Sequence, residues 1–182
     1  MNPLPSILVL LAAFLAVFWE AAFSGVRHLL GAQIDLLPAL MVYASLWTGL
    51  TSVALLALLG GLWFDSLSAN PLGVTVLPLF VIGLAIYANR ELILRDQTFA
   101  QFVLGLGASA AAPALTLVIL LSTGHTPMLG WGMLWQWAVM SLGGAIATPV
   151  CFELFGWLHR TLVHGGPVQS SFRADREIRR GR

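Results

Sequence analysis

The chain contains 182 residues, of which 58% are hydrophobic and only 9% are charged. Because a soluble globular domain carries about 25% charged residues, this composition excludes an ordinary water-soluble protein and predicts an all-α polytopic membrane protein. The formal net charge is only +1, and the basic residues gather towards one end of the chain, which argues against nucleic-acid binding.

The N-terminal apolar run predicts a retained transmembrane helix. It extends from Leu4 to Phe23 with no Lys or Arg before it, and at about 20 residues it exceeds the roughly 7–15 of a signal-peptide core. Such a run is long enough to cross about 30 Å of hydrocarbon. Within it, Ala12 and Ala16 have the small-residue spacing that allows another helix to dock closely.

Five further apolar runs complete a predicted compact bundle of about six transmembrane helices. Residues 36–64 are too few for two full spans and too many for one. We expect them to form a thin hairpin that breaks at Gly49, beside Thr48, Thr51 and Ser52, although one long tilted helix would give five spans. The five runs are residues 36–47, 50–64, 71–89, 99–122 and 131–159.

Arginine placement predicts the orientation in the membrane. If the N-terminus lies in the cytoplasm and six helices cross, the loop 89–98 and the tail from residue 159 also lie inside. Arg27 is then the only arginine outside, which satisfies the positive-inside rule. A five-span chain keeps this loop and the tail together but moves the N-terminus outside.

The C-terminal tail is predicted to be a separate, flexible segment. Residues 1–164 form the transmembrane bundle, and residues 165–182 form a basic cytoplasmic tail that begins with Gly-Gly-Pro and contains the acids Asp175 and Glu177. The tail is expected to contact anionic lipid headgroups. The arginines predicted to make these contacts are Arg173, Arg176, Arg179 and Arg180.

Two glutamates fall inside the predicted spans, where acids are costly and usually serve a purpose. Glu20, near the outer end of the first helix, either reaches the headgroups or pairs with Arg27 or His28, or makes a buried polar contact with a neighbouring or partner helix. Glu153 in the last span either snorkels towards the cytoplasm or has a structural or partner-binding role.

The sequence contains no recognisable catalytic or metal-binding constellation. The single cysteine, Cys151, allows no internal disulfide, and the histidines form no HExxH motif. The glycine-rich residues 105–110 superficially match a dinucleotide-binding pattern, but no strand precedes them and they are predicted to serve helix packing. We therefore expect a protein that is not an enzyme, without catalytic residues, cofactor or metal. The four histidines are His28, His125, His159 and His164.

The most specific feature is the stretch from Gly60 to Gly73. An apolar helix is predicted to reach Asp65, break in a short serine-rich turn and restart at Pro71, with Asn70 as its N-cap. This pattern predicts two helices joined by a stiff outer turn. Its candidate residues for partner interaction or for structure are Asp65, Ser66, Ser68, Asn70, Pro71, Leu72 and Gly73.

Two roles are open for Asp65. Its side chain can steady the turn by accepting a hydrogen bond from the Leu67 amide two residues on. Alternatively, because the dipole at a helix C-terminus disfavours an anion, the carboxylate needs a compensating donor, for example on a partner chain. Gly73 is expected to allow close approach of neighbouring helices.

The pattern Asp-x-Leu-Ser-x-x-Pro-Leu-Gly at residues 65–73 follows Gly61-Leu62-Trp63-Phe64 and precedes an apolar helix that ends in Arg90. Upstream, Asp35-Leu36-Leu37-Pro38 opens a short helix. With these features, residues 34–95 resemble the bacterial rod shape-determining protein MreD family.

This resemblance implies a non-enzymatic component of the cell-elongation machinery in the bacterial inner membrane. Proteins of this family associate with the bitopic protein MreC. With it they support the RodA glycosyltransferase, its penicillin-binding transpeptidase partner and actin-like MreB filaments during peptidoglycan synthesis in the cell wall. The protein would act as a scaffold that presents a helical face and an outer turn to these partners.

A different class remains as the alternative. Substrate-binding S-components of energy-coupling-factor vitamin transporters are also small six-helix membrane proteins, and the resemblance extends to their architecture. Ala12 and Ala16 have the spacing that such subunits use to dock on their transporter. The predicted outer segments 24–34 and 122–130, however, offer few convergent polar groups for a water-soluble ligand.

The predicted topology can be tested by cysteine labelling. Ser68 and His125 are expected outside, and Arg95 and the tail inside. In a Cys151→Ser background, an impermeant maleimide applied to intact spheroplasts should label Ser68→Cys and spare Arg95→Cys. The opposite labelling pattern would show that the orientation is reversed.

Overall fold

The computed structural model of the protein describes residues 4–22, 31–68, 71–93, 97–124 and 130–163. These residues form helices joined by turns and include no strand, so the predicted all-α class is confirmed for the described part. The helices in chain order are α1 (Leu4–Ala22), α3 (Leu37–Trp47), α4 (Leu50–Leu55), the π-helical turn η1 (Leu56–Gly60), α5 (Gly61–Leu67), α6 (Val76–Ala88), α7 (Thr98–Ser122) and α8 (Trp131–Val163).

Among these described residues, four helical stretches are long and apolar enough to cross a membrane. They are Pro5–Ala22, Leu50–Leu67, Thr98–Ser122 and Trp131–Leu158. The second comprises α4, η1 and α5, which form one long helix, called the α4–α5 helix below. Helices α3 and α6 contain only 11 and 13 residues. At 1.5 Å per residue, both are shorter than the roughly 30 Å hydrocarbon core. All six predicted apolar runs contain a helix, whereas six complete spans remain a prediction.

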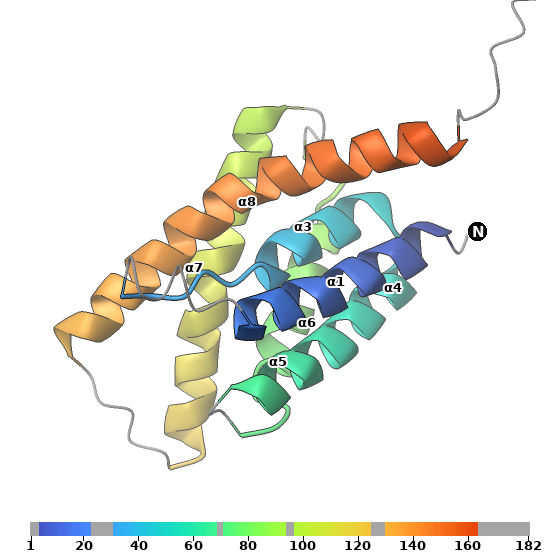
Figure 1. Ribbon diagram of the computed structural model, residues 1–182. Helices are drawn as coiled ribbons and strands as arrows, with labels where there is room; N and C mark the ends of the chain where they lie inside the picture. Colours follow the sequence, from blue (N-terminus) through green and yellow to red (C-terminus); the bar gives the residue numbers. More distant parts are fainter. Residues whose placement is uncertain (1–3, 23–30, 69–70, 94–96, 125–129, 164–182) are drawn as a thin grey trace, which may run out of the picture.

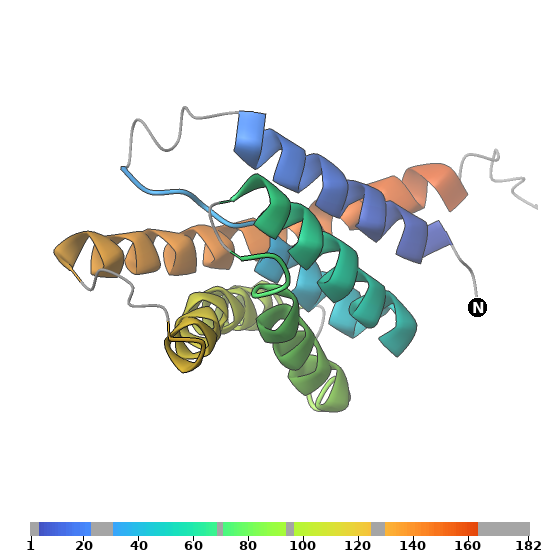
Figure 2. The same cartoon turned by 90° about the horizontal axis from the view of Figure 1, so that it is seen from below.

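Helix α3 occupies the centre of the bundle. Helices α1 and α4–α5 run side by side in the same direction next to it, and α8 crosses it on the other side (Figure 1, Figure 2). Helices α6 and α7 also contact α3. Every residue of α3 except Tyr43 and Trp47 is buried, because neighbouring helices surround it.

A sharp turn at Thr48 and Gly49 separates α3 from the α4–α5 helix. Both residues have extended backbone conformations, and the Thr48 hydroxyl donates a hydrogen bond to the Ala44 carbonyl oxygen at 2.6 Å. The Ser52 hydroxyl, one turn into α4, lies 2.6 Å from that of Ser6 on α1. The predicted hairpin with its break at Gly49 is therefore confirmed, and the tilted-helix alternative is wrong.

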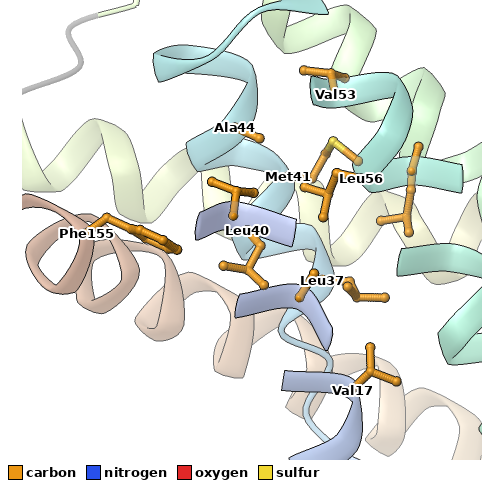
Figure 3. Close-up of a cluster of buried hydrophobic side chains, with 12 residues drawn as sticks. Val17, Leu37, Leu40, Met41, Ala44, Val53, Leu56 and Phe155 are labelled. Carbon is orange, nitrogen blue, oxygen red and sulfur yellow. The ribbon is translucent and has the colours of Figure 1, made fainter. Parts of the chain in front are cut away.

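The main apolar core forms where α1, α3 and the α4–α5 helix meet. Figure 3 shows side chains of α3 enclosed by residues of the other two helices and by Phe155 of α8. A second cluster joins α3 to α6, α7 and α8. The first cluster contains Val9, Ala13, Val17, Leu37, Leu40, Met41, Ala44, Val53, Leu56, Ala57, Leu79 and Phe155, and the second contains Val42, Leu46, Ile82, Ala108, Ala112 and Phe152.

Small residues bring α7 and α8 into close contact. A Cβ atom at Gly105 would collide with the Thr148 side chain and lie 2.8 Å from the Gly144 carbonyl oxygen. A Cβ atom at Gly144 would collide with Ser109. The prediction that the glycine-rich residues 105–110 serve helix packing rather than cofactor binding agrees with this contact.

Helix α6 begins later than predicted. The restart was expected at Pro71, but residues 72–75 form a turn and α6 begins at Val76, with Thr75 as its N-cap residue. Gly73 has a φ of +90°, which a right-handed helix cannot contain. The predicted N-cap Asn70 lies outside the described residues. Two other helices extend beyond their predicted ends, α5 to Leu67 and α8 to Val163.

The α7–α8 contact predicts opposite effects for two neighbouring glycines. Gly105→Ala should lower the stability by about 1–3 kcal/mol, because the methyl group overfills a packed interface. Gly107→Ala should leave the stability unchanged or raise it by up to about 1 kcal/mol, since a Cβ atom there meets nothing within 4 Å and alanine favours helix. Thermal unfolding in detergent measures both, and equal effects would contradict the packing interpretation.

Candidate functional site

The centre of the candidate site is Asp65, near the end of α5, which is only 2% exposed. Its Oδ2 accepts hydrogen bonds from the backbone amides of Gly73 at 2.9 Å and Thr75 at 3.1 Å. Its Oδ1 accepts a hydrogen bond from the Thr75 hydroxyl. Because a buried charge is costly unless it is hydrogen-bonded, these three donors explain how a carboxylate is tolerated here.

Neither sequence-based expectation for Asp65 identified its donors. The expected bond from the Leu67 amide is absent because α5 continues to Leu67 and places that amide within the helix. The other expectation was that the Asp65 carboxylate needs a compensating hydrogen-bond donor, and the structure agrees with this need. These donors lie in the same chain, at the N-terminus of α6, where the helix dipole favours an anion. Both carboxylate oxygens are engaged inside the protein, so Asp65 closes the turn.

Gly73 has a different role from the one predicted. A Cβ atom at this position would meet nothing within 4 Å, so close helix approach does not require glycine here. The positive φ requires it, because side chains disfavour that conformation. The close approach occurs instead at Gly61, where a Cβ atom would lie 2.9 Å from the backbone of Val76.

The remaining described motif residues cap α5 or face outward. The Ser66 hydroxyl donates to the Trp63 carbonyl oxygen at 2.8 Å, and the Ser68 hydroxyl donates to that of Asp65 at 3.4 Å. Pro71 and Leu72 are exposed at the surface of the turn. The motif therefore combines a closed interior with an outward apolar edge.

A second carboxylate contact joins α1 to α3. Glu20 Oε1 accepts a hydrogen bond from the Leu36 amide at 2.8 Å, and Asp35 Oδ1 accepts one from the Leu37 amide at 2.9 Å. The two acids thus bind consecutive amides at the start of α3, where the helix dipole favours negative charge. Burial raises the pKa of the Asp35 carboxyl. Glu20 Oε2 is buried without a hydrogen-bond partner among the described residues.

Of the two interpretations of Glu20, the polar contact with a neighbouring helix agrees with its part-buried hydrogen bond to the Leu36 amide. Arg27 and His28 lie outside the described residues. Asp35 and Thr75 were not identified as site residues from sequence. A usable signal existed, because each precedes a Leu-Pro pair by two or three residues, where a helix N-terminus is common.

The other candidate residues do not join either carboxylate site. Ala12 and Ala16 are partly buried and pack against the main apolar core of the same chain. The Glu153 side chain is exposed on α8. The described residues include no group of His, Cys, Asp or Glu arranged to hold a metal ion. The tail arginines Arg173, Arg176, Arg179 and Arg180 lie outside the described residues.

Comparison with known proteins gave no match, since no family model, no curated protein and no solved structure is significantly similar to this chain. Its class therefore follows from its own features. The described residues form a helical bundle with four helices that could cross a membrane, and carboxylates bind the starts of the short helices α3 and α6.

The hydrogen-bond geometry predicts unequal responses to two substitutions. Asp65→Ala should destabilise the protein by about 1–3 kcal/mol, because it leaves the buried donors of Gly73 and Thr75 without an acceptor. Glu20→Gln should have a much smaller effect, because it keeps the oxygen that binds Leu36 and no described donor faces the other position. Thermal unfolding in detergent compares the two, and similar losses of stability would contradict this assignment.

Proposed function

We propose that this protein is a non-enzymatic inner-membrane component of the bacterial cell-elongation machinery, of the kind formed by the MreD family. In this role it scaffolds or regulates peptidoglycan synthesis by binding an MreC-like bitopic protein and the RodA glycosyltransferase with its transpeptidase, near MreB filaments. Both of its termini then lie in the cytoplasm.

The observation that carries this proposal is the closure of the outer turn by the motif itself. The first and last residues of Asp-x-Leu-Ser-x-x-Pro-Leu-Gly bind each other, since Asp65 accepts a hydrogen bond from the Gly73 amide at 2.9 Å. The motif that underlies the resemblance is thus one structural unit rather than a chance string of residues. A turn held in this way loses little entropy on binding, which favours a recognition role for its exposed edge.

The exposed edge of the turn provides a surface for contact with a partner protein. Pro71 and Leu72 project from the closed turn, whereas Asp65 is hidden beneath it. The acid therefore shapes the surface, and the apolar side chains above it contact the partner. If the partner has two conformations, the scaffold can shift the balance between them only by the difference in its affinity for each.

The packing of α1 favours this proposal over a vitamin-transporter subunit. In the transporter alternative, Ala12 and Ala16 dock on the transporter. Here both residues pack against the main apolar core of their own chain.

Depletion of the protein in its own host and purification from native membranes test the proposal. Depleted cells should lose their rod shape, and the tagged protein should recover an MreC-like protein and a RodA-type glycosyltransferase. Leu72→Ser should reduce this recovery, whereas Ser122→Ala, which alters an exposed polar side chain at the end of α7, should not. Recovery of transporter ATPases or of a bound vitamin, or normal rod shape after depletion, would contradict the proposal.

A further inference from the structure

Four helices, α1, α3, the α4–α5 helix and α6, form two units built in the same way. In each unit a long helix carries two aromatic residues and an acid near its end, Phe18-Trp19-Glu20 in α1 and Trp63-Phe64-Asp65 in α5. The acid accepts hydrogen bonds from backbone amides at the start of the short helix that follows. Both short helices carry a Leu-Pro pair in their first turn, Leu37-Pro38 in α3 and Leu77-Pro78 in α6, and both prolines are buried. Unit 1 is α1 with α3, and unit 2 is the α4–α5 helix with α6.

The short helix of unit 1 is covered on both sides. The α3 residues Leu37, Met41 and Ala44 are completely buried in the main apolar core, where α1, the α4–α5 helix and α6 all contribute residues (Figure 3). The approach is close, because a Cβ atom at Gly60 would lie 3.1 Å from the Leu37 side chain. The long helix of the next unit thus covers this face of α3.

Among the described residues, no further helix covers the equivalent face of unit 2. Aligning the Leu-Pro pairs matches those three α3 residues to Leu77, Val81 and Leu84 of α6, which are 57%, 43% and 41% exposed. The next helix in the chain, α7, packs against Ile82 on the opposite, buried side of α6. Within the described residues, no helix lies against this face of α6 in the way that the α4–α5 helix lies against α3.

The length of α6 makes simple lipid exposure unfavourable. The other helices with exposed apolar faces, such as α1, α7 and α8, are long enough to cross the membrane, but α6 has only 13 residues. Hydrogen-bonded turns flank α6 at both ends and carry Leu72 and Leu92, which are 70% and 84% exposed. A helix that is shorter than the hydrocarbon core thins the bilayer around it or associates with another helix, so an exposed apolar face on α6 favours cover by protein.

We propose that the α6 face, formed by Leu77, Val81 and Leu84, binds a single membrane-spanning helix of another polypeptide. This helix takes the position in unit 2 that the α4–α5 helix takes in unit 1. It is apolar where it meets the face, because the face carries no charge, and it is long enough to cover both flanking turns. This inference rests on the proposed function, since it names the surface that a bitopic partner would use.

Photocrosslinking in native membranes tests the occupant. A photoreactive amino acid at Leu77, Val81 or Leu84 should give one discrete protein adduct, whose crosslinked peptide lies in a membrane-spanning segment of another polypeptide. The same amino acid at Val118 of α7 or Val150 of α8, which are also exposed apolar positions, should react with lipid. Lipid adducts alone at the α6 positions would overturn the proposal, as would adducts to a second copy of this chain.

Substitution on the same face tests whether the contact contributes to binding. Val81→Trp should lower recovery of the crosslinked partner about tenfold, as expected for a disrupted interface centre, whereas Val150→Trp should not. Leu84→Ala provides a second variant that adds no bulk, and it should lower recovery in the same direction. An unchanged melting temperature shows that the variants fold, and unchanged recovery in both α6 variants would overturn the proposal.

These results separate the interface from the proposed function. A crosslinked partner that is unrelated to cell elongation would contradict the function and leave the α6 interface standing. Recovery of an MreC-like protein that is insensitive to both α6 substitutions would support the function and reject the interface.

Discussion

The need to satisfy helix N-termini buried inside a membrane protein controls the rest of this structure. The first amides of a helix have no partners within it, and the hydrocarbon region has no water to supply them. Helices α3 and α6 are too short to place both ends at the membrane surfaces. Asp65 and Glu20 solve this problem by accepting hydrogen bonds from the starts of these helices. Each acid also fixes the short helix to the long helix before it.

The fixed short helices determine how the bundle packs. Because α3 is held against α1 at one end and turns sharply at Gly49 at the other, it remains at the centre. The other helices pack around it, and glycines set the closest distances. Gly61 brings α5 against α6, and Gly105 with Gly144 brings α7 against α8. The packing is therefore specified by close steric fit, as expected where lipid provides no hydrophobic drive between helices.

The same arrangement leaves α6 as the exposed helix that is too short for the membrane. Its inner side packs against α3, α4 and α7, and its outer side is apolar. Leu72, in the turn before α6, is also exposed. The proposed scaffold function would use such a surface, because an exposed apolar helix face can bind a partner helix.

The sequence alone determined the membrane class, the helical runs and the break at Gly49. These depend on hydropathy and on local backbone preferences, which neighbouring residues decide. Only the tertiary structure decided the donors of Asp65 and Glu20, the start of α6 and the role of Gly73. The Glu20 contact with Leu36 joins residues 16 apart, and the Asp65 contact with Thr75 joins residues 10 apart. Such contacts depend on how a turn folds back, which composition and helical periodicity do not encode.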